Sequence, residues 1–149
     1  MKLASKNLTS LTLELSGTNP VIIFKNANLE VAAKRIVWGK FFNSGQSCIA
    51  PNHIFVDKEI ENNLIEKLKQ CIVSFYGKDP IISKNLAKLE KKQFLSTLKI
   101  LKRYKKEERI LYGGTFSKKK LKISPTILKT KLDETDILQK ELFLSLIHI

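Results

Sequence analysis

Apolar residues recur along the chain with two periods. From residue 10 to residue 15 every second position is a leucine, a period that predicts a β-strand with one buried face. Short apolar runs predict four more strands, at residues 21–24, 54–56, 109–112 and 124–128. Apolar residues three or four positions apart predict three helices, at residues 29–42, 58–76 and 86–104. We also expect a polar hairpin or loop at residues 118–122, a short helical turn at 133–138 and a last strand at 141–143.

The predicted helices are bounded by residues that are typical of helix ends. Asn26 and Asn28 are N-cap candidates for the first helix, and Asp57 is the candidate for the second. Gly45 and Gly77 are expected just past the ends of these two helices. Because strands alternate with long helices, the sequence predicts an α/β domain with a largely parallel sheet flanked by helices.

The charge is large and unevenly distributed. The 149 residues are enough for one domain, and they carry a net charge of +13 from 27 basic and 14 acidic residues. Residues 84–122 hold twelve lysines and two arginines against three glutamates. Such a segment is either a nucleic-acid or anionic-surface patch or a solvated helical face. We favour the solvated face and expect no nucleic-acid partner, because the chain has three arginines in all and no aromatic-rich strand motif accompanies the charge.

Composition excludes several other classes. No apolar stretch approaches the 18 residues or so of a membrane span, and the first residues have no apolar signal-peptide core. Two cysteines fit a reducing compartment, so we expect a cytoplasmic protein without a transmembrane segment. Two histidines and two cysteines that do not cluster predict no metal site.

Two positions stand out as candidates for chemistry. Cys48 lies in a small polar loop between a predicted helix and strand, where a thiol can act as a nucleophile; the alternative is a small buried apolar residue, the role that we assign to Cys71. Glu14 interrupts an apolar strand at its carboxyl end, where ligands of open α/β sheets bind. A partly desolvated carboxylate there is a candidate general base, and the alternative is a solvent-facing strand residue.

Two motifs around these positions resemble a known family. Residues 13–20 read Leu-Glu-Leu-Ser-Gly-Thr-Asn-Pro, which resembles the Leu-Glu-Leu-Gly-Gly-Lys-x-Pro signature of the aldehyde dehydrogenase superfamily. Residues 41–48 read Phe-Phe-Asn-Ser-Gly-Gln-Ser-Cys, which is similar to that family's Phe-x-Asn-x-Gly-Gln-x-Cys nucleophile motif. The glutamate and the cysteine lie 34 positions apart, which is the family's spacing. Landmarks of the class-3, fatty aldehyde dehydrogenase branch follow in order, so the resemblance covers residues 1–143.

The resemblance implies a fold, an activity and a set of site residues. The fold would be the Rossmann-like catalytic domain of an aldehyde dehydrogenase, and the activity the NAD- or NADP-dependent oxidation of a small-molecule aldehyde to a carboxylic acid. Cys48 would form a thiohemiacetal and then a thioester, and Glu14 would activate the hydrolytic water. Glu141 would hold the nicotinamide ribose and Phe143 would lie beside the nicotinamide, whose pocket the backbone around Leu15 and Gly17 would line. The parent enzyme is expected to be a homodimer.

The resemblance also suggests domain boundaries. Residues 1–16 would be the tail of a dinucleotide-binding domain that carries the catalytic-glutamate strand, and residues 17–143 an incomplete catalytic domain. Residues 144–149, Leu-Ser-Leu-Ile-His-Ile, resemble the in-frame translation of a transposase sequencing adapter, so we leave them out of the fold prediction. The chain would therefore be truncated at both ends and inactive alone, because catalysis needs the cofactor held beside the cysteine.

Two residues depart from the glutamate signature. Ser16 replaces its first glycine and Thr18 replaces its lysine. If position 16 requires a positive φ, serine there costs about 1–3 kcal/mol of strain. Two alternatives to an enzyme stay open. These substitutions leave open a non-catalytic remnant of the fold, and the lysine-rich segment leaves open a basic module that binds nucleic acid or an anionic surface.

Overall fold

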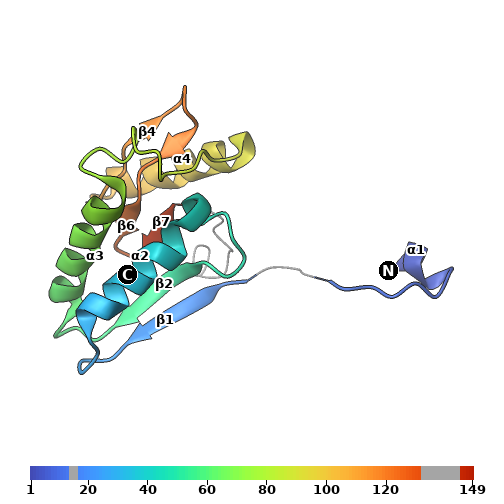
Figure 1. The fold of residues 1–149 in the computed structure, drawn as a ribbon, viewed down its shortest axis with the longest axis horizontal. Coiled ribbons are helices and arrows are strands. Elements are labelled where there is room, and N and C mark those ends of the chain that lie inside the picture. The colour runs from blue at the N-terminus through green and yellow to red at the C-terminus, as the bar shows by residue number, and fades with distance from the viewer. Residues whose placement is uncertain (14–16, 132–144) are drawn as a thin grey trace.

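A five-stranded sheet forms the centre of the fold (Figure 1). The structure is a computed structural model that describes residues 1–13, 17–131 and 145–149. The strands lie in the order β1 (Asn19–Ile23), β2 (Pro51–Val56), β7 (Leu146–His148), β6 (Thr126–Leu128) and β3 (Ile110–Tyr112). The first four strands run parallel to one another, whereas β3 pairs with β6 in the antiparallel sense. The predicted α/β class with a mostly parallel sheet is confirmed.

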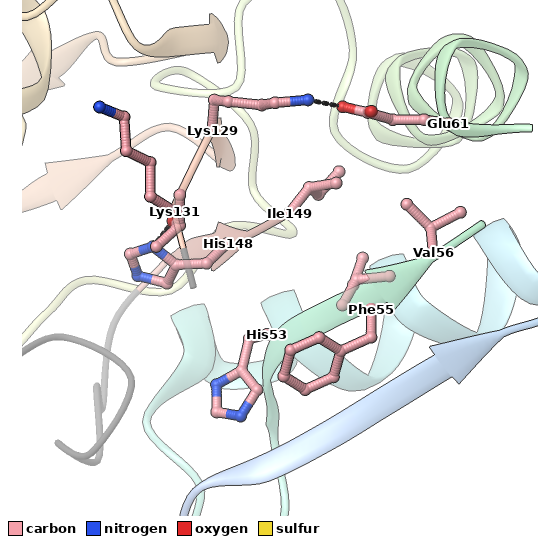
Figure 2. A pocket seen from close by; sticks show the side chains of 10 residues that line it. His53, Phe55, Val56, Glu61, Lys129, Lys131, His148 and Ile149 are labelled. Atoms are coloured by element: carbon pink, nitrogen blue, oxygen red, sulfur yellow. Dashed lines mark hydrogen bonds and ion pairs between the residues drawn. The ribbon is translucent and has the colours of Figure 1, made fainter. Parts of the chain in front are cut away.

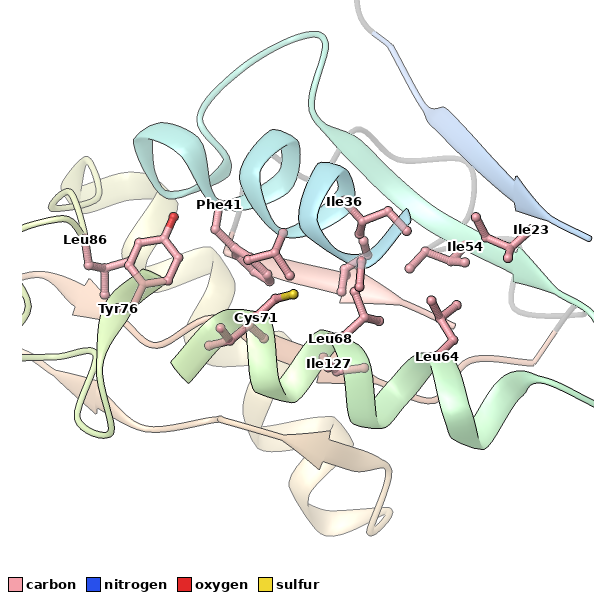
Figure 3. Packing of buried hydrophobic residues seen from close by; sticks show 14 residues of the cluster. Ile23, Ile36, Phe41, Ile54, Leu64, Leu68, Cys71, Tyr76, Leu86 and Ile127 are labelled. Atoms are coloured by element: carbon pink, nitrogen blue, oxygen red, sulfur yellow. The ribbon is translucent and has the colours of Figure 1, made fainter. Parts of the chain in front are cut away.

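Helices cover both faces of this sheet. Helices α2 (Leu29–Phe41) and α3 (Glu61–Tyr76) pack against one face and share a core with β1, β2, β6 and β7 (Figure 3). Helix α4 (Lys91–Lys106) belongs to a second cluster. Ile127 packs in the first cluster and Leu128 in the second, and neighbouring strand residues point to opposite faces. The helices α2 and α3 therefore lie on one side of the sheet and α4 on the other.

The helix boundaries agree in part with the expected ones. Asn28 caps α2, because its Oδ1 accepts a hydrogen bond from the Val31 amide at 3.1 Å, and α3 ends before Gly77 as predicted. Helix α3 begins later than expected, at Glu61, because Asp57 caps a preceding turn. Helix α4 also begins later, at Lys91. Leu86 and Leu89 are buried in the loop before it and so continue its apolar spacing without being helical.

The first predicted strand is not formed by the part of it that the structure describes. Residues 1–13, with the short helix α1 (Lys2–Ser5), extend away from the body of the molecule (Figure 1). Residues 10–13 form no strand, and Leu11 and Leu13 are about half exposed. A strand is stable when it is hydrogen-bonded to a neighbour, and these four residues have no pairing partner among the described residues.

The last third of the chain contains a hairpin and a central strand. Strands β4 (Phe116–Ser117) and β5 (Lys122–Ile123) pair in the antiparallel sense around the predicted polar turn. The helical turn at 133–138 and the strand at 141–143 lie outside the described residues.

Strand β7 comes from the segment 144–149, which was not expected to belong to the fold, and it lies between β2 and β6. The adapter origin of this segment and the proposed domain boundaries stay predictions.

Candidate functional site

Cys48 lies in the turn between α2 and β2 and is partly exposed. Helix α2 stops at Phe41, one residue before the predicted end, and Gly45 does not directly follow the helix as predicted. A short 3-10 segment, Phe42–Gly45, follows it, and Asn43, Ser44 and Gly45 have positive φ angles of 48°, 57° and 77°. These three left-handed residues reverse the direction of the chain after α2. Residues other than glycine rarely adopt this conformation, so the loop that carries the thiol has an unusual backbone at Asn43 and Ser44.

Gln46 fastens one side of this loop to the segment before α4. Its Nε2 donates to the carbonyls of Asn43 (3.1 Å) and Lys88 (3.2 Å), and its Oε1 accepts from the amide of Glu90 at 2.9 Å. The Ser44 hydroxyl adds a bond of 2.6 Å to the carbonyl of Ala87. The glutamine of the cysteine motif thus has a structural role that sequence reasoning did not assign.

The segment that contains Gly17 fastens the other side. Asn19 Nδ2 donates to the carbonyl of Cys48 at 2.6 Å and to the carbonyl of Ala50 at 3.2 Å. A Cβ atom at Gly17 would lie 3.2 Å from the carbonyl oxygen of Cys48, so the bare glycine backbone permits this close approach. Cys48 and Gly17 are therefore brought together, at the amino ends of β1 and β2. No signal in the sequence indicates the role of Asn19, because this residue occupies the variable position of the glutamate signature.

A buried lysine lies next to this arrangement. Lys40, in the last turn of α2, is fully buried, and its Nζ donates to Asn52 Oδ1 at 3.4 Å. Asn52 Nδ2 in turn donates to the carbonyl of Gly17 at 3.3 Å. Burial lowers the pKa of Lys40 from 10.5 to about 7. Burial, and after it the Lys40 charge, lowers the pKa of His53. Position 40 continues the apolar stripe of α2, and that signal could have revealed the lysine.

The second cysteine behaves as expected. Cys71 is buried among the core side chains between α2 and α3 (Figure 3). Burial is the main cause that raises the pKa of its thiol. A buried thiol with a raised pKa reacts slowly, because the thiolate is the reactive form. Cys71 therefore provides an internal reference for the reactivity of Cys48.

Four predicted site residues lie outside the described residues: Glu14, Leu15, Glu141 and Phe143. The predicted meeting of Glu14 with Cys48, and the predicted cofactor contacts other than Gly17, stay predictions. Of the predicted set, the structure thus places Cys48 and Gly17 and brings them together.

A separate cavity of about 210 Å³ opens near the carboxyl ends of β2, β6 and β7 (Figure 2). His53 and Phe55 on β2 line it from one side, and Lys129 and His148 from the other. The Lys129 ammonium pairs with the Glu61 carboxylate across the cavity. No predicted site residue lines it, and Cys48 lies at the opposite end of β2.

The lysine-rich segment forms the outer face of α4. Six lysines of this helix are exposed, namely Lys91, Lys92, Lys99, Lys102, Lys105 and Lys106. Their helix buries Phe94, Leu98 and Leu101 on its other side. This two-sided arrangement is that of an amphipathic helix, and the choice between a solvated face and an anion-binding patch stays a prediction.

Comparison with known proteins shows the family. The sequence profile described as "Aldehyde dehydrogenase family" matches residues 1–149, and the chain belongs to this family. It is similar to the dimeric NADP-preferring aldehyde dehydrogenase of Canis lupus familiaris, with 38% identity over 144 residues, which are 96% of this chain and 31% of the relative. It is also similar to aldehyde dehydrogenase family 3 member H1 of Arabidopsis thaliana, with 36% identity over 100% of this chain and 31% of the relative.

Solved structures give the same result. The substrate-bound state of Staphylococcus aureus AldH superimposes with a TM-score of 0.91 at 32% identity, over 99% of this chain and 32% of that chain. The lactaldehyde dehydrogenase of Escherichia coli superimposes with a TM-score of 0.81 at 27% identity, over 99% of this chain and 32% of that one. The class-3 resemblance is confirmed, and the chain spans about a third of the length of these relatives.

Among the residues that the structure describes, no helix combines the length and the apolar character that crossing a membrane requires. Within the same residues, no three histidine, cysteine, aspartate or glutamate side chains gather where they could bind a metal ion.

Proposed function

We propose that this chain is the central part of an aldehyde dehydrogenase catalytic domain, and that Cys48 is the nucleophile. The observation that carries the proposal is the Cys48 loop itself. It is partly exposed, is fastened by Gln46 on one side and by Asn19 on the other, and has the cysteine motif of the family to which the chain belongs. A nucleophile held on a rigid loop at the edge of an α/β sheet is suited to attack a bound carbonyl group.

The chemistry follows from the thiolate. Its sulfur attacks the aldehyde carbon, a C–S bond forms, and the carbonyl electron pair moves to the oxygen. The Cys48 backbone N–H and an asparagine amide would stabilise this oxyanion. Loss of hydride from the carbon leaves a thioester, which water hydrolyses to the carboxylic acid while the thiolate departs. Glu14 would take the proton from that water as the general base.

The cofactor would be NAD or NADP, which accepts the hydride when it is bound. The described residues fit one part of such a site, because Gly17 presents bare backbone beside Cys48. Leu15, Glu141 and Phe143 would complete the contacts to the nicotinamide end. Among the described residues no glycine-rich loop is suited to the phosphates. Relatives named NADP-preferring make NADP a candidate equal to NAD.

Substrates and setting are part of the same proposal. Aliphatic aldehydes are the expected substrates of the parent enzyme, which we expect to be a cytoplasmic homodimer. The relatives of dog, rat and mouse are named dimeric, whereas one plant relative is named chloroplastic. The chain by itself should not reduce NAD or NADP with an aldehyde, because the cofactor is not held beside Cys48. Robust turnover by the chain alone would overturn this last point.

Protection by an aldehyde tests the proposed nucleophile. The chain is treated with iodoacetamide near neutral pH, with and without a medium-chain aldehyde, and labelling of each cysteine is followed by mass spectrometry. Reversible thiohemiacetal formation should slow the labelling of Cys48 severalfold and leave Cys71 unchanged, and Cys48→Ser serves as the control. Equal labelling of Cys48 in both samples would contradict the proposal.

A further inference from the structure

Lys40 is a buried ionisable group for which the proposed chemistry has no use. Its side chain is fully buried at the end of α2, and its hydrogen-bond partner among the described residues is the neutral amide of Asn52, at 3.4 Å. Burying an ammonium without a carboxylate is unfavourable, so a methionine or leucine would satisfy the core better. The position of Lys40 in the last turn of its helix offsets part of this cost, because carbonyl groups at a helix C-terminus favour a cation. Because burying an ammonium here lowers stability, we expect the contacts of Lys40 to show a function that explains its presence.

The geometry of Asn52 shows what the lysine does. Asn52 is buried at the start of β2, and its Nδ2 donates to the carbonyl of Gly17 at 3.3 Å. A side-chain amide donates from one end and accepts at the other, whereas a lysine Nζ is a donor in its charged form. Below its pKa of about 7, where it is charged, Lys40 therefore requires the oxygen of Asn52 to face it. The opposite orientation would turn Nδ2 toward the ammonium and Oδ1 toward the Gly17 carbonyl, so that neither contact is a hydrogen bond.

The carbonyl of Gly17 belongs to the segment that supports the cysteine. Two residues further on, Asn19 Nδ2 holds the carbonyl of Cys48 at 2.6 Å and that of Ala50 at 3.2 Å. The contacts Lys40–Asn52 and Asn52–Gly17 thus form a chain from the end of α2 to the segment that holds the nucleophile loop. Both contacts are long, and therefore weak, for hydrogen bonds. Neither is expected to fix the orientation of the Asn52 amide alone, so the two contacts act together.

We propose that Lys40 is a positioning residue, which acts through the amide of Asn52 to hold residues 17–19 against the loop that carries Cys48. This role rests on the proposed function, since that loop matters to the reaction if Cys48 is the nucleophile. Lys40 itself contacts neither substrate nor cofactor in this account. Its effect passes through one amide, and the effect is lost when that amide can no longer donate.

Two substitutions separate this role from plain core packing. Lys40→Met keeps a long buried side chain and removes the donor to Asn52. Asn52→Asp keeps an acceptor for Lys40 and removes the NH2 group that holds the carbonyl of Gly17. If Lys40 acts through Asn52, both variants release residues 17–19. If Lys40 contributes to core stability alone, Lys40→Met leaves that segment in place, whereas Asn52→Asp still releases it because the donor to the Gly17 carbonyl is gone.

The experiment uses the full chain labelled with ¹⁵N. In both variants the backbone amide signals of Gly17, Thr18 and Cys48 and the side-chain NH2 signals of Asn19 should move in the same direction. The double variant should move them no further than Asn52→Asp does. Lys34→Met, on the exposed side of the same helix, is the control and should leave these signals unmoved. Unmoved signals in Lys40→Met or in Asn52→Asp would overturn the proposal.

Cysteine labelling supplies the functional readout. A released loop exposes its thiol, so iodoacetamide should label Cys48 at least threefold faster in both variants, while Cys71 reports any general unfolding. An unchanged rate at Cys48 would overturn the positioning role. Failure of the proposed function has a different signature, since it appears in the unsubstituted chain as a Cys48 that an aldehyde does not protect.

Discussion

The pH dependence of stability should reveal the buried ammonium of Lys40. Burial lowers the pKa of Lys40 from 10.5 to about 7 in the folded chain, whereas the unfolded chain keeps the ordinary value. Above pH 10.5 the lysine is neutral in both states and burial costs no ionisation energy. Below pH 7 it is charged in both states and the whole cost is present. Between these limits the unfolded chain binds the proton more tightly, so stability rises as the pH rises.

The size of the effect follows from the difference in pKa. At ~1.36 kcal/mol for each pKa unit, the difference corresponds to about 5 kcal/mol between pH 7 and pH 10.5. Lys40→Met removes this dependence and leaves Asn52 without its donor, at a cost of about 1 kcal/mol. The variant should therefore be more stable than the unsubstituted chain by about 4 kcal/mol at pH 6–7, and the two stabilities should become equal near pH ~10.

Urea unfolding followed by far-UV circular dichroism, repeated from pH 6 to pH 10, measures this difference. Groups remote from Lys40 contribute equally to the pH dependence of both chains, so their contributions cancel in the difference in unfolding free energy. The contribution of His53 does not cancel, because the Lys40 charge, after burial, is a cause of its lowered pKa and is absent from Lys40→Met. Lys34→Met provides a matched control that should show a flat difference. A difference that stays constant with pH would refute the reasoning, since it would mean that Lys40 keeps an ordinary pKa in the folded chain.

Three further substitutions test the frame around the site. Gln46→Ala removes two hydrogen bonds between the Cys48 loop and the segment before α4 and one within the loop, and it should lower the free energy of unfolding by about 1–2 kcal/mol in urea; no change would show that these bonds do not hold the loop. Gly113→Ala places a Cβ 2.2 Å from the carbonyl oxygen of Pro125 at a φ of +82° and should lower the melting temperature by about 10 °C or more. Gly77→Ala meets no atom within 4 Å at a φ of +80° and a ψ of 177°, so it isolates the backbone cost and should lower stability by about 1–3 kcal/mol; equal effects of the two glycine variants would contradict the packing argument.

Sequence reasoning predicted the fold well where apolar spacing and helix caps agreed. Asn28 and Gly77 mark helix ends in the structure as in the sequence, because each is a local signal that tertiary contacts do not override. The start of α4 was predicted too early, since Leu86 and Leu89 pack into the core from a loop. Spacing alone does not distinguish a buried loop leucine from one on a helix.

The candidate site was predictable in its chemistry and less so in its supports. The cysteine motif points to Cys48, and in the structure the Gly17 segment lies against it. The contacts of Asn19, Asn52 and Lys40 join residues 12 to 35 positions apart in the chain, so no local pattern reveals them. A lysine on the apolar stripe of α2 was a visible signal, but its partner could be identified from the folded structure alone.

The relative reactivity of the two cysteines tests the central claim most directly. In the unsubstituted chain near neutral pH, iodoacetamide should alkylate the partly exposed Cys48 well before Cys71, whose thiol is buried and has a raised pKa. Mass spectrometry of the digested chain gives both rates in one sample. Equal and slow labelling of the two thiols would contradict the assignment of Cys48 as a nucleophile and would favour a non-catalytic member of the family.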